Sequence, residues 1–319
     1  MHRRHFLGSL AALTALAAAR RSFATPREPV FAVDVPGRWD PLAVDDTDAH
    51  VYAPDKRERA AFVANVRAFL AVVQSHPAWQ KPMGFVARPH LTFGSGGLYE
   101  RPPAPIAGIL TIQTFWYVRD AEGRPTLGVE ASMHQKLIFN SCDAIFLRQY
   151  AKVAADATDT LYFLPKAEPS AAGIPHFETG HVVTKRSAPP LVAVAQRRLL
   201  EAWLGEARHD LRDDPKNPRA IADTARLERE LAALGPDAAT APAYCDGAWN
   251  RRLARPGDPG ARPVGAPNPD FFDRGLPRGA LQLALVGYGT SNLSHDPSMI
   301  RVRDALVRQP WDRMRDVLA

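Results

Sequence analysis

The clearest periodic pattern in the chain predicts an amphipathic helix over residues 55–75. Apolar side chains recur there at helical spacing, and they are Ala61, Phe62, Val66, Phe69, Leu70 and Val73. Basic residues such as Arg57 and Arg67 are available for the opposite face. We expect this helix to bury its apolar face and to end at His76 and Pro77, because the residue before a proline disfavours helical backbone.

A second pattern, rich in β-forming residues, predicts an antiparallel hairpin over about residues 107–139. Its first strand covers 107–118, a turn sequence follows at 120–123, and the return strand covers 127–139. On the return strand Leu127, Val129, Ala131 and Met133 share one face, and Glu130, Ser132, His134 and Lys136 share the other. One face of the hairpin should therefore be buried and the other polar.

The rest of the chain predicts short strands and several helices. Strands are expected near 30–35, 161–164, 181–184 and 280–286, and helices over 144–157, 189–211 and 218–234 and from 297 onward. The short apolar runs at 85–87 and 91–93 leave strand and loop open. Residues 255–269 contain five prolines and three glycines, which predicts a loop.

This order of elements predicts an α+β fold rather than alternating βαβ units. We expect an antiparallel sheet built on the central hairpin and packed with several helices. Composition agrees with a globular protein, since 46% of the 319 residues are hydrophobic and 23% are charged. That excludes a chain disordered throughout and a polytopic membrane protein. The length allows one domain or two, and we expect residues 25–319 to form a single domain.

The first 24 residues have the layout of an export signal: a basic start, an apolar middle and small residues at the end. Arg3 and Arg4, followed after one residue by Phe6 and Leu7, resemble the core of the twin-arginine (Tat) export motif. The resemblance covers the signal peptide only. It implies that the twin-arginine translocation machinery and a signal peptidase are partners, and that the mature protein is periplasmic or secreted.

The uncharged stretch 6–19 is 14 residues long, which makes about 21 Å of helix against a hydrocarbon core of about 30 Å. No stable membrane span is therefore expected after cleavage. Removing residues 1–24 also removes four arginines and no acid, so the formal charge falls from +6 to +2. The composition of the mature chain therefore does not indicate a nucleic-acid partner.

Cys142 and Cys245 are the two cysteines of the chain, and an oxidising compartment would permit a disulfide between them. The alternative is two independent buried thiols, because Cys142 closely follows an apolar run in which a small hydrophobic residue serves equally well. We favour the bridge.

His176, Glu178 and His181 have the residue types that zinc or another divalent ion prefers. The two histidines are five residues apart, so they fall on different faces of a helix and on opposite faces of a strand. Only a loop would bring them together, and the other interpretation is a turn leading into a strand. The sequence indicates no cofactor, which leaves the cofactor unknown.

Trp116 on the first hairpin strand, with Ser132 and His134 on the second, is a candidate ligand groove if the polar face of the sheet is open. A sugar, a peptide or an acyl group would suit such a groove. The alternative is that helices cover both faces of the sheet.

The sequence thus predicts an exported bacterial cell-envelope protein with a binding or structural role, which includes holding a small ligand. The alternative is an exported hydrolase or metalloenzyme that uses His134, His176 or His181 together with Glu130 or Glu178.

Overall fold

The computed structural model describes residues 30–47, 49–53, 55–94, 105–146, 152–156, 160–170, 173–247, 250–290 and 297–319. The predicted export signal, residues 1–24, lies outside these ranges. Within them, no helix has both the length and the apolar character that a membrane crossing requires.

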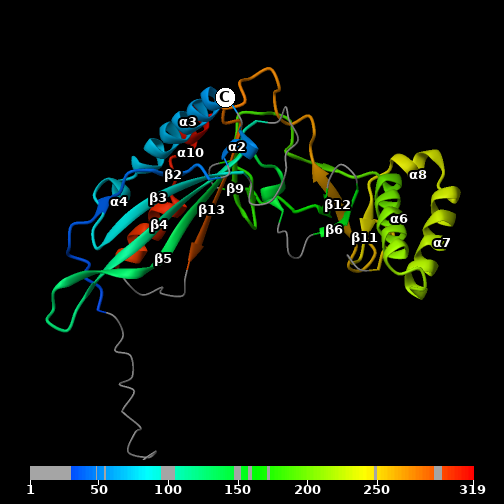
Figure 1. The fold of residues 1–319 in the computed structure, drawn as a ribbon, viewed down its shortest axis with the longest axis horizontal. Helices are drawn as coiled ribbons and strands as arrows, with labels where there is room; N and C mark the ends of the chain where they lie inside the picture. Colours follow the sequence, from blue (N-terminus) through cyan, green and yellow to red (C-terminus); the bar gives the residue numbers. More distant parts are fainter. Residues whose placement is uncertain are drawn as a thin grey trace, which may run out of the picture.

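The fold is α+β, as predicted, and it contains two β-sheets with helices packed against each (Figure 1). The larger sheet has the strand order β1-β3-β4-β5-β13-β9-β8, with β2 also beside β3. Its strands are β1 (Arg38–Trp39), β2 (Ala43–Asp45), β3 (Phe85–Phe93), β4 (Gly108–Arg119), β5 (Pro125–Phe139), β8 (His176–Phe177), β9 (Gly180–Thr184) and β13 (Leu283–Thr290). The strands pair antiparallel, except that β1 and β2 run parallel to β3.

Helices cover one face of this first sheet, which we call the covered face. They are α2 (Ala49–Tyr52), α3 (Lys56–Gln74), α4 (Pro77–Gln80), α9 (Pro297–Val307) and α10 (Trp311–Asp316). Helix α3 confirms the strongest sequence prediction, and the carboxylate of Asp55 caps it by accepting from the backbone N–H groups of Arg57 and Glu58. The rings of Phe62 and Phe69 on α3 contact Phe139 of β5, so the apolar stripe of the helix lies on the sheet.

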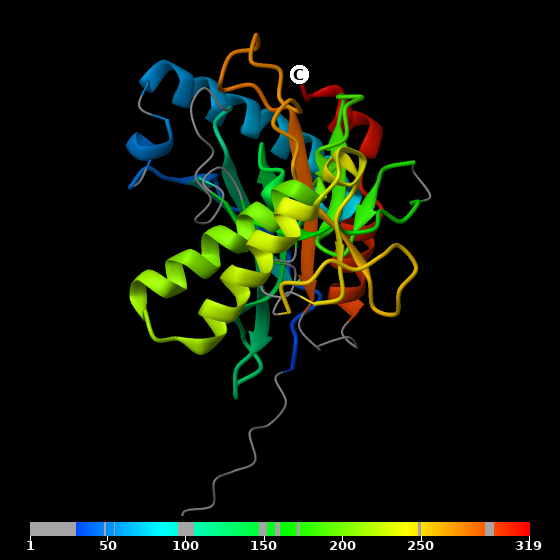
Figure 2. The same cartoon turned by 90° about the vertical axis from the view of Figure 1, so that its right-hand side faces the viewer.

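The second sheet has the order β10-β12-β7-β6, with β11 also paired to β12. Its strands are β6 (Lys152–Ala155), β7 (Thr160–Phe163), β10 (Leu191–Ala193), β11 (Tyr244–Cys245) and β12 (Arg262–Pro267). Helices α6 (Gln196–Asp213), α7 (Pro218–Ala233) and α8 (Pro236–Thr240) belong to this sheet and lie at the opposite end of the molecule from α3 and α4 (Figure 1). Seen from that end, α6 and α7 lie side by side (Figure 2).

Three hydrophobic clusters hold the two sheets and their helices. The first lies between the covered face and its helices, and the second lies between α6, α7 and the second sheet. The third contains residues of both sheets, including Val182 and Leu285 of the first and Tyr162 and Leu191 of the second. The second sheet therefore covers the β5-β13-β9 end of the other face of the first sheet, and among the described residues nothing comparable covers the β3-β4-β5 end of that face.

Two predicted helices are wrong in whole or in part. The described parts of the predicted helix 144–157 are not helical: a short 3-10 turn, η1 (Asp143–Ile145), stands at its start, and residues 152–155 form β6, which pairs with β7. Residues 191–193 form β10 rather than the start of a helix, and α6 begins only at Gln196. In both places strand pairing, with the next strand for β6 and with the distant β12 for β10, overrides a local helical pattern.

The predicted loop at 255–269 is corrected too, because residues 262–267 form β12, a strand with neighbours on both sides. Pro263 is tolerated there because its carbonyl still accepts a hydrogen bond from the backbone N–H of Leu164. A side chain at Gly265 would collide with Leu164 and approach the carbonyl oxygen of Val192 to 3.0 Å. The glycine thus permits close strand packing rather than marking a loop.

The remaining predictions follow the structure more closely. The hairpin of β4 and β5, helix α7 and strands β7, β9 and β13 confirm the predicted elements within a few residues. The run from 85 to 93, left open between strand and loop, is the continuous strand β3. The region near 30–35 contributes an isolated bridge between Phe31 and Val118 instead of a strand.

Candidate functional site

The open end of the first sheet presents two rows of polar side chains. In one row Thr111 of β4 pairs with His90 of β3 and with Lys136 of β5. In the other, Gln113 pairs with Arg88 and His134 in the same way. Directly paired residues lie on one face of a sheet, so these side chains project together across three strands. We call the set the open patch: Arg88, His90, Thr111, Gln113, His134 and Lys136.

The open patch is most accessible on its β5 side. Gln113, His134 and Lys136 are exposed, whereas Arg88 is half-buried and is held by the carboxylate of Asp40 at 3.0 Å. The Arg88 guanidinium also lies 4.4 Å from the ring centroid of Phe115. Among the described residues, no carboxylate pairs with Lys136 or His134. Positive charge on the patch is therefore least compensated near β5.

The carboxylates near the patch lie at its β1 and β2 edge and are already engaged. Asp40 also accepts from Arg38 at 3.0 Å. Hydrogen bonds from Thr47 lower the pKa of Asp45, and the nearby imidazole of His90 adds to this effect. Asp45 therefore stays ionised, and both Asp40 and Asp45 are bonded to their neighbours. They leave the exposed donors of β5 available to a ligand.

The predicted groove of Trp116, Ser132 and His134 is not assembled as expected. Trp116 lies on the covered face, is 2% exposed and packs on the ring of Phe85 at 5.3 Å, whereas His134 projects from the opposite face. The side chain of Ser132 lies outside the description. The register of β4 against β5 shifts twice between Thr114 and residue 117, which the alternation of a single strand does not reveal. The aromatic residues that share the face of His134 are Phe115 and Tyr117.

The predicted alternation is confirmed at the end of β5. His134 and Lys136 are exposed, and Leu137 is buried on the covered face. The polar character of this part of the hairpin was therefore readable from the sequence, even though the position of Trp116 was not.

His176 and His181 do meet, although by a different route from the one expected. They pair directly across the β8–β9 hairpin, and their ring centroids are 4.4 Å apart. Gly180 closes the hairpin with φ at +141°, a value that favours glycine. Glu178 sits in the turn with its side chain exposed. The five-residue spacing of the two histidines therefore arises from two paired strands, and not from a single strand or a loop.

The His181 ring also stacks on Trp311 of α10, with the centroids 4.6 Å apart. Burial, with a contribution from His176, lowers the pKa of His181 to about 4. The carboxylate nearest to His176 belongs to Glu168, whose Oε2 is 4.0 Å from Nδ1. In the part of the chain that the structure describes, no three His, Cys, Asp or Glu residues are grouped to hold a metal ion.

The residues considered for a hydrolase or metalloenzyme lie apart. His181 pairs with Val286 on the covered face, whereas His134 lies on the open patch of the opposite face. Glu178 stands in the hairpin turn, and the side chain of Glu130 lies outside the description. The structure thus brings together only the two histidines of the β8–β9 hairpin.

No disulfide joins Cys142 to Cys245 in the structure, and both side chains are buried. Cys142 belongs to the third cluster and Cys245 to the second, so the two thiols lie in separate apolar environments. Burial raises the pKa of Cys245 to about 11, which keeps its thiol protonated and unreactive at neutral pH. The alternative of two independent buried thiols is the one observed.

Comparisons with known proteins give no match: no family model fits the chain, and no curated protein or solved structure is significantly similar to it. The function must therefore be argued from the residues themselves.

Proposed function

We propose that the protein is an exported binding protein of the bacterial cell envelope and that its open patch holds an extended, hydroxylated anion such as a segment of an acidic glycan. Export rests on residues 1–24, with Arg3 and Arg4 resembling the twin-arginine motif. The observation that carries the ligand class is the pair of cross-strand rows, in which exposed Lys136 and His134 have no carboxylate partner among the described residues.

The chemistry of the patch supports a ligand that carries both acid groups and hydroxyl groups. Lys136 and Arg88 supply cationic donors for carboxylate or sulfate oxygens. Gln113 and Thr111, between them, both donate and accept hydrogen bonds, as sugar hydroxyls require. The patch spans three strands, which is about 10 Å at a strand spacing of about 4.8 Å. A ligand that contacts the whole length of a row must therefore be extended across the strands.

The aromatic residues beside the open patch favour recognition of a ligand by polar contacts rather than by stacking on a sugar ring. Phe115 is half-buried and its ring already carries the Arg88 guanidinium. The Tyr117 hydroxyl accepts from Arg38 at 3.5 Å. The ring of Phe115 is thus not free to stack on a sugar, and affinity should come from charged and hydrogen-bonded contacts, which salt weakens.

Binding of polygalacturonate, measured by affinity electrophoresis with neutral dextran as the comparison polymer, tests the proposal. We expect retardation by polygalacturonate only, because dextran has no acid groups. Lys136→Glu should weaken the interaction roughly tenfold, since it replaces a charged donor by a like charge. Lys166→Glu, at an exposed lysine outside the patch, is the matched control and should leave binding unchanged. Equal retardation of the two variants, or none of the parent protein, would refute a glycan site on the patch.

A further inference from the structure

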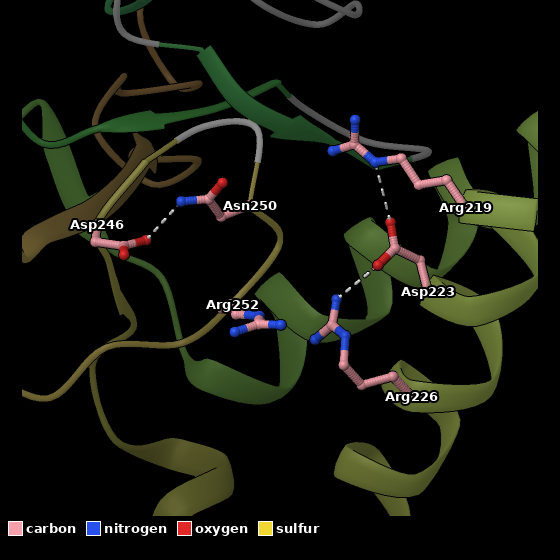
Figure 3. A pocket seen from close by; sticks show the side chains of 6 residues that line it. All are labelled: Arg219, Asp223, Arg226, Asp246, Asn250 and Arg252. Carbon is pink, nitrogen blue, oxygen red and sulfur yellow. Dashed lines mark hydrogen bonds and ion pairs between the residues drawn. The ribbon is translucent and has the colours of Figure 1, made fainter.

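A separate polar site lies in the other part of the molecule, between α7 and the segment that follows β11 (Figure 3). It is a pocket of about 330 Å³, and we call it the arginine pocket. Its lining residues are Arg219, Asp223, Arg226, Asp246, Asn250 and Arg252. All six carry charged or amide side chains, so the pocket suits a small polar ligand rather than an apolar one.

One side of the pocket is a ladder of ion pairs along α7. Asp223 lies 3.8 Å from Arg219 and 3.0 Å from Arg226, and Arg226 also donates to Glu230 at 2.9 Å. Figure 3 shows Arg219, Asp223 and Arg226 projecting from successive turns of the helix. Their spacing of three and four residues puts them on one face, which fixes the position of each guanidinium.

The other side of the pocket is a loop that Arg251 holds in place. The backbone φ of Arg251 is +47°, a value that residues with side chains rarely adopt. Its side chain is only 16% exposed and lies 3.0 Å from Asp210, 3.6 Å from Glu206 and 3.6 Å from Asp223. Arg251 thus ties residues 250–252 to α6 and α7 together.

Positive charge exceeds negative charge on the pocket lining, which has three guanidinium groups and two carboxylates. Asp223 is shared among the arginines around it, and Asp246 is 3.5 Å from the amide of Asn250. Figure 3 shows Arg252 beside Arg226 with no interaction drawn to it. Among the described residues no carboxylate pairs with Arg252, which is exposed. Two neighbouring guanidinium groups, one of them uncompensated, attract an anion.

We propose that the arginine pocket binds a small hydroxylated anion, namely a phosphorylated or acidic sugar. Arg252 and Arg226 hold its phosphate or carboxylate, because guanidinium groups match these oxygens with paired hydrogen bonds. Asp246 and Asn250 take its hydroxyl groups. The volume lies at the lower end of the usual range for small-molecule sites, about 300–1,000 Å³, which fits a single sugar unit. This site is distinct from the open patch and does not depend on it.

Isothermal titration at low ionic strength with glucose 6-phosphate, glucuronate and neutral glucose tests this proposal on the purified protein. We expect heat from one or both anions and none from glucose. Arg252→Gln should weaken binding about tenfold, because it removes a charged, donating group from an exposed position where folding is not at stake. Arg255→Gln changes another exposed arginine, three residues further along and outside the pocket, and should bind like the parent protein.

The proposal is overturned if neither anion binds more tightly than about 10 mM, or if glucose binds as well as glucose 6-phosphate. It is also overturned if Arg252→Gln binds like the parent, or if Arg255→Gln loses as much affinity as Arg252→Gln. The Lys136→Glu variant separates the two sites, because it should weaken polygalacturonate binding and leave glucose 6-phosphate binding unchanged.

Discussion

The two sheets of this protein are stabilised in different ways. Beneath the covered face of the first sheet the core is aromatic, with Phe62, Phe69, Trp79, Phe85 and Phe139 in mutual ring contacts. The core between α6 and the second sheet consists largely of alanine, valine and leucine, with Trp203 as its largest fully buried side chain. Aromatic side chains bury more area per residue, so the first core should carry more of the apolar stabilisation.

The second sheet and its helices rely more on ion pairs. Arg198 bonds Asp156 at 2.9 Å, and Arg251 faces three carboxylates on α6 and α7. Charged helix faces are thus available on this side to line the arginine pocket. The first sheet uses its helices mainly for apolar burial and presents the polar groups of the open patch on its other face. The difference explains why the two candidate sites differ in kind, a pocket in one place and a flat patch in the other.

The largest expected effect follows from truncating an aromatic residue in the first core. Phe139 is fully buried, with its ring centroid 5.2 Å from that of Phe69 and 6.5 Å from that of Phe62. Phe139→Ala should lower the free energy of unfolding by about 3–5 kcal/mol, through lost burial and the cavity left behind. Urea denaturation followed by circular dichroism measures it.

Phe163→Ala provides the matched comparison in the second sheet. Phe163 is 5% exposed, and its ring carries the guanidinium of Arg262 at 4.1 Å from the centroid. Phe163→Ala should lower the free energy of unfolding by less than Phe139→Ala, because Phe163 lies closer to solvent. If Phe163→Ala destabilises the protein as much as Phe139→Ala, the proposed contrast between the two cores fails.

The next effect concerns the ion pairs of the second sheet's helices. Arg251→Ala should lower the free energy of unfolding by about 2 kcal/mol, because it leaves Asp210, Glu206 and Asp223 without a shared, largely buried partner. It should also weaken glucose 6-phosphate binding, since the loop that presents Arg252 is no longer held. Thermal denaturation and titration measure the two consequences.

Arg208→Ala is the control for a salt bridge of similar length on the surface. Arg208 lies 2.9 Å from Glu228, but both side chains are about half exposed, so the loss should be under about 1 kcal/mol. If Arg208→Ala and Arg251→Ala lower the free energy of unfolding equally, burial does not make the ion pairs of Arg251 stronger than the exposed pair of Arg208.

The sequence predicted the elements whose hydrophobic patterns extend over many consecutive residues. Helix α3 has a cap at Asp55 and an apolar stripe over five turns, and the β4–β5 hairpin has two long strands around a turn. Of the second sheet only β7 was predicted, because its other strands are short and most of them pair with residues far away in the chain. Strand β12, with two prolines and a glycine, pairs with β7 about 100 residues earlier, and only that pairing distinguishes it from a loop.

The candidate sites, like the elements, were predictable where the signal is local in the sequence and were missed where it depends on distant residues. His134 and Lys136 were readable from alternation on one strand, whereas the position of Trp116 relative to them depends on how β4 pairs with its neighbours, where Trp116 lies opposite the buried Phe85 of β3. The arginine pocket was not foreseen, because its two sides come from α7 and from Asp246, Asn250 and Arg252, joined by Arg251 with its left-handed backbone. Separate clusters likewise keep Cys142 and Cys245 apart.

The smallest expected effect is a pH dependence that belongs to the first sheet. The pKa of His181, lowered to about 4 by burial and by His176, is below its ordinary value of 6.5, so the unfolded chain binds this proton more readily than the folded one. The stability contributed by neutral His181 is complete above about pH 6.5 and is lost as the pH falls toward about 4. Because the ring is partly solvated, we expect a loss of about 1 kcal/mol.

His181→Gln should flatten the dependence of the unfolding free energy on pH between about 4 and 6.5, as followed by urea denaturation at several pH values. His134→Gln, at an exposed histidine of the open patch, should leave the slope unchanged. The two variants compare a partly buried histidine with an exposed one on the same sheet. If His181→Gln keeps the parent slope, acid sensitivity arises elsewhere, and the stacked contact of His181 with Trp311 is not what makes the first sheet sensitive to pH.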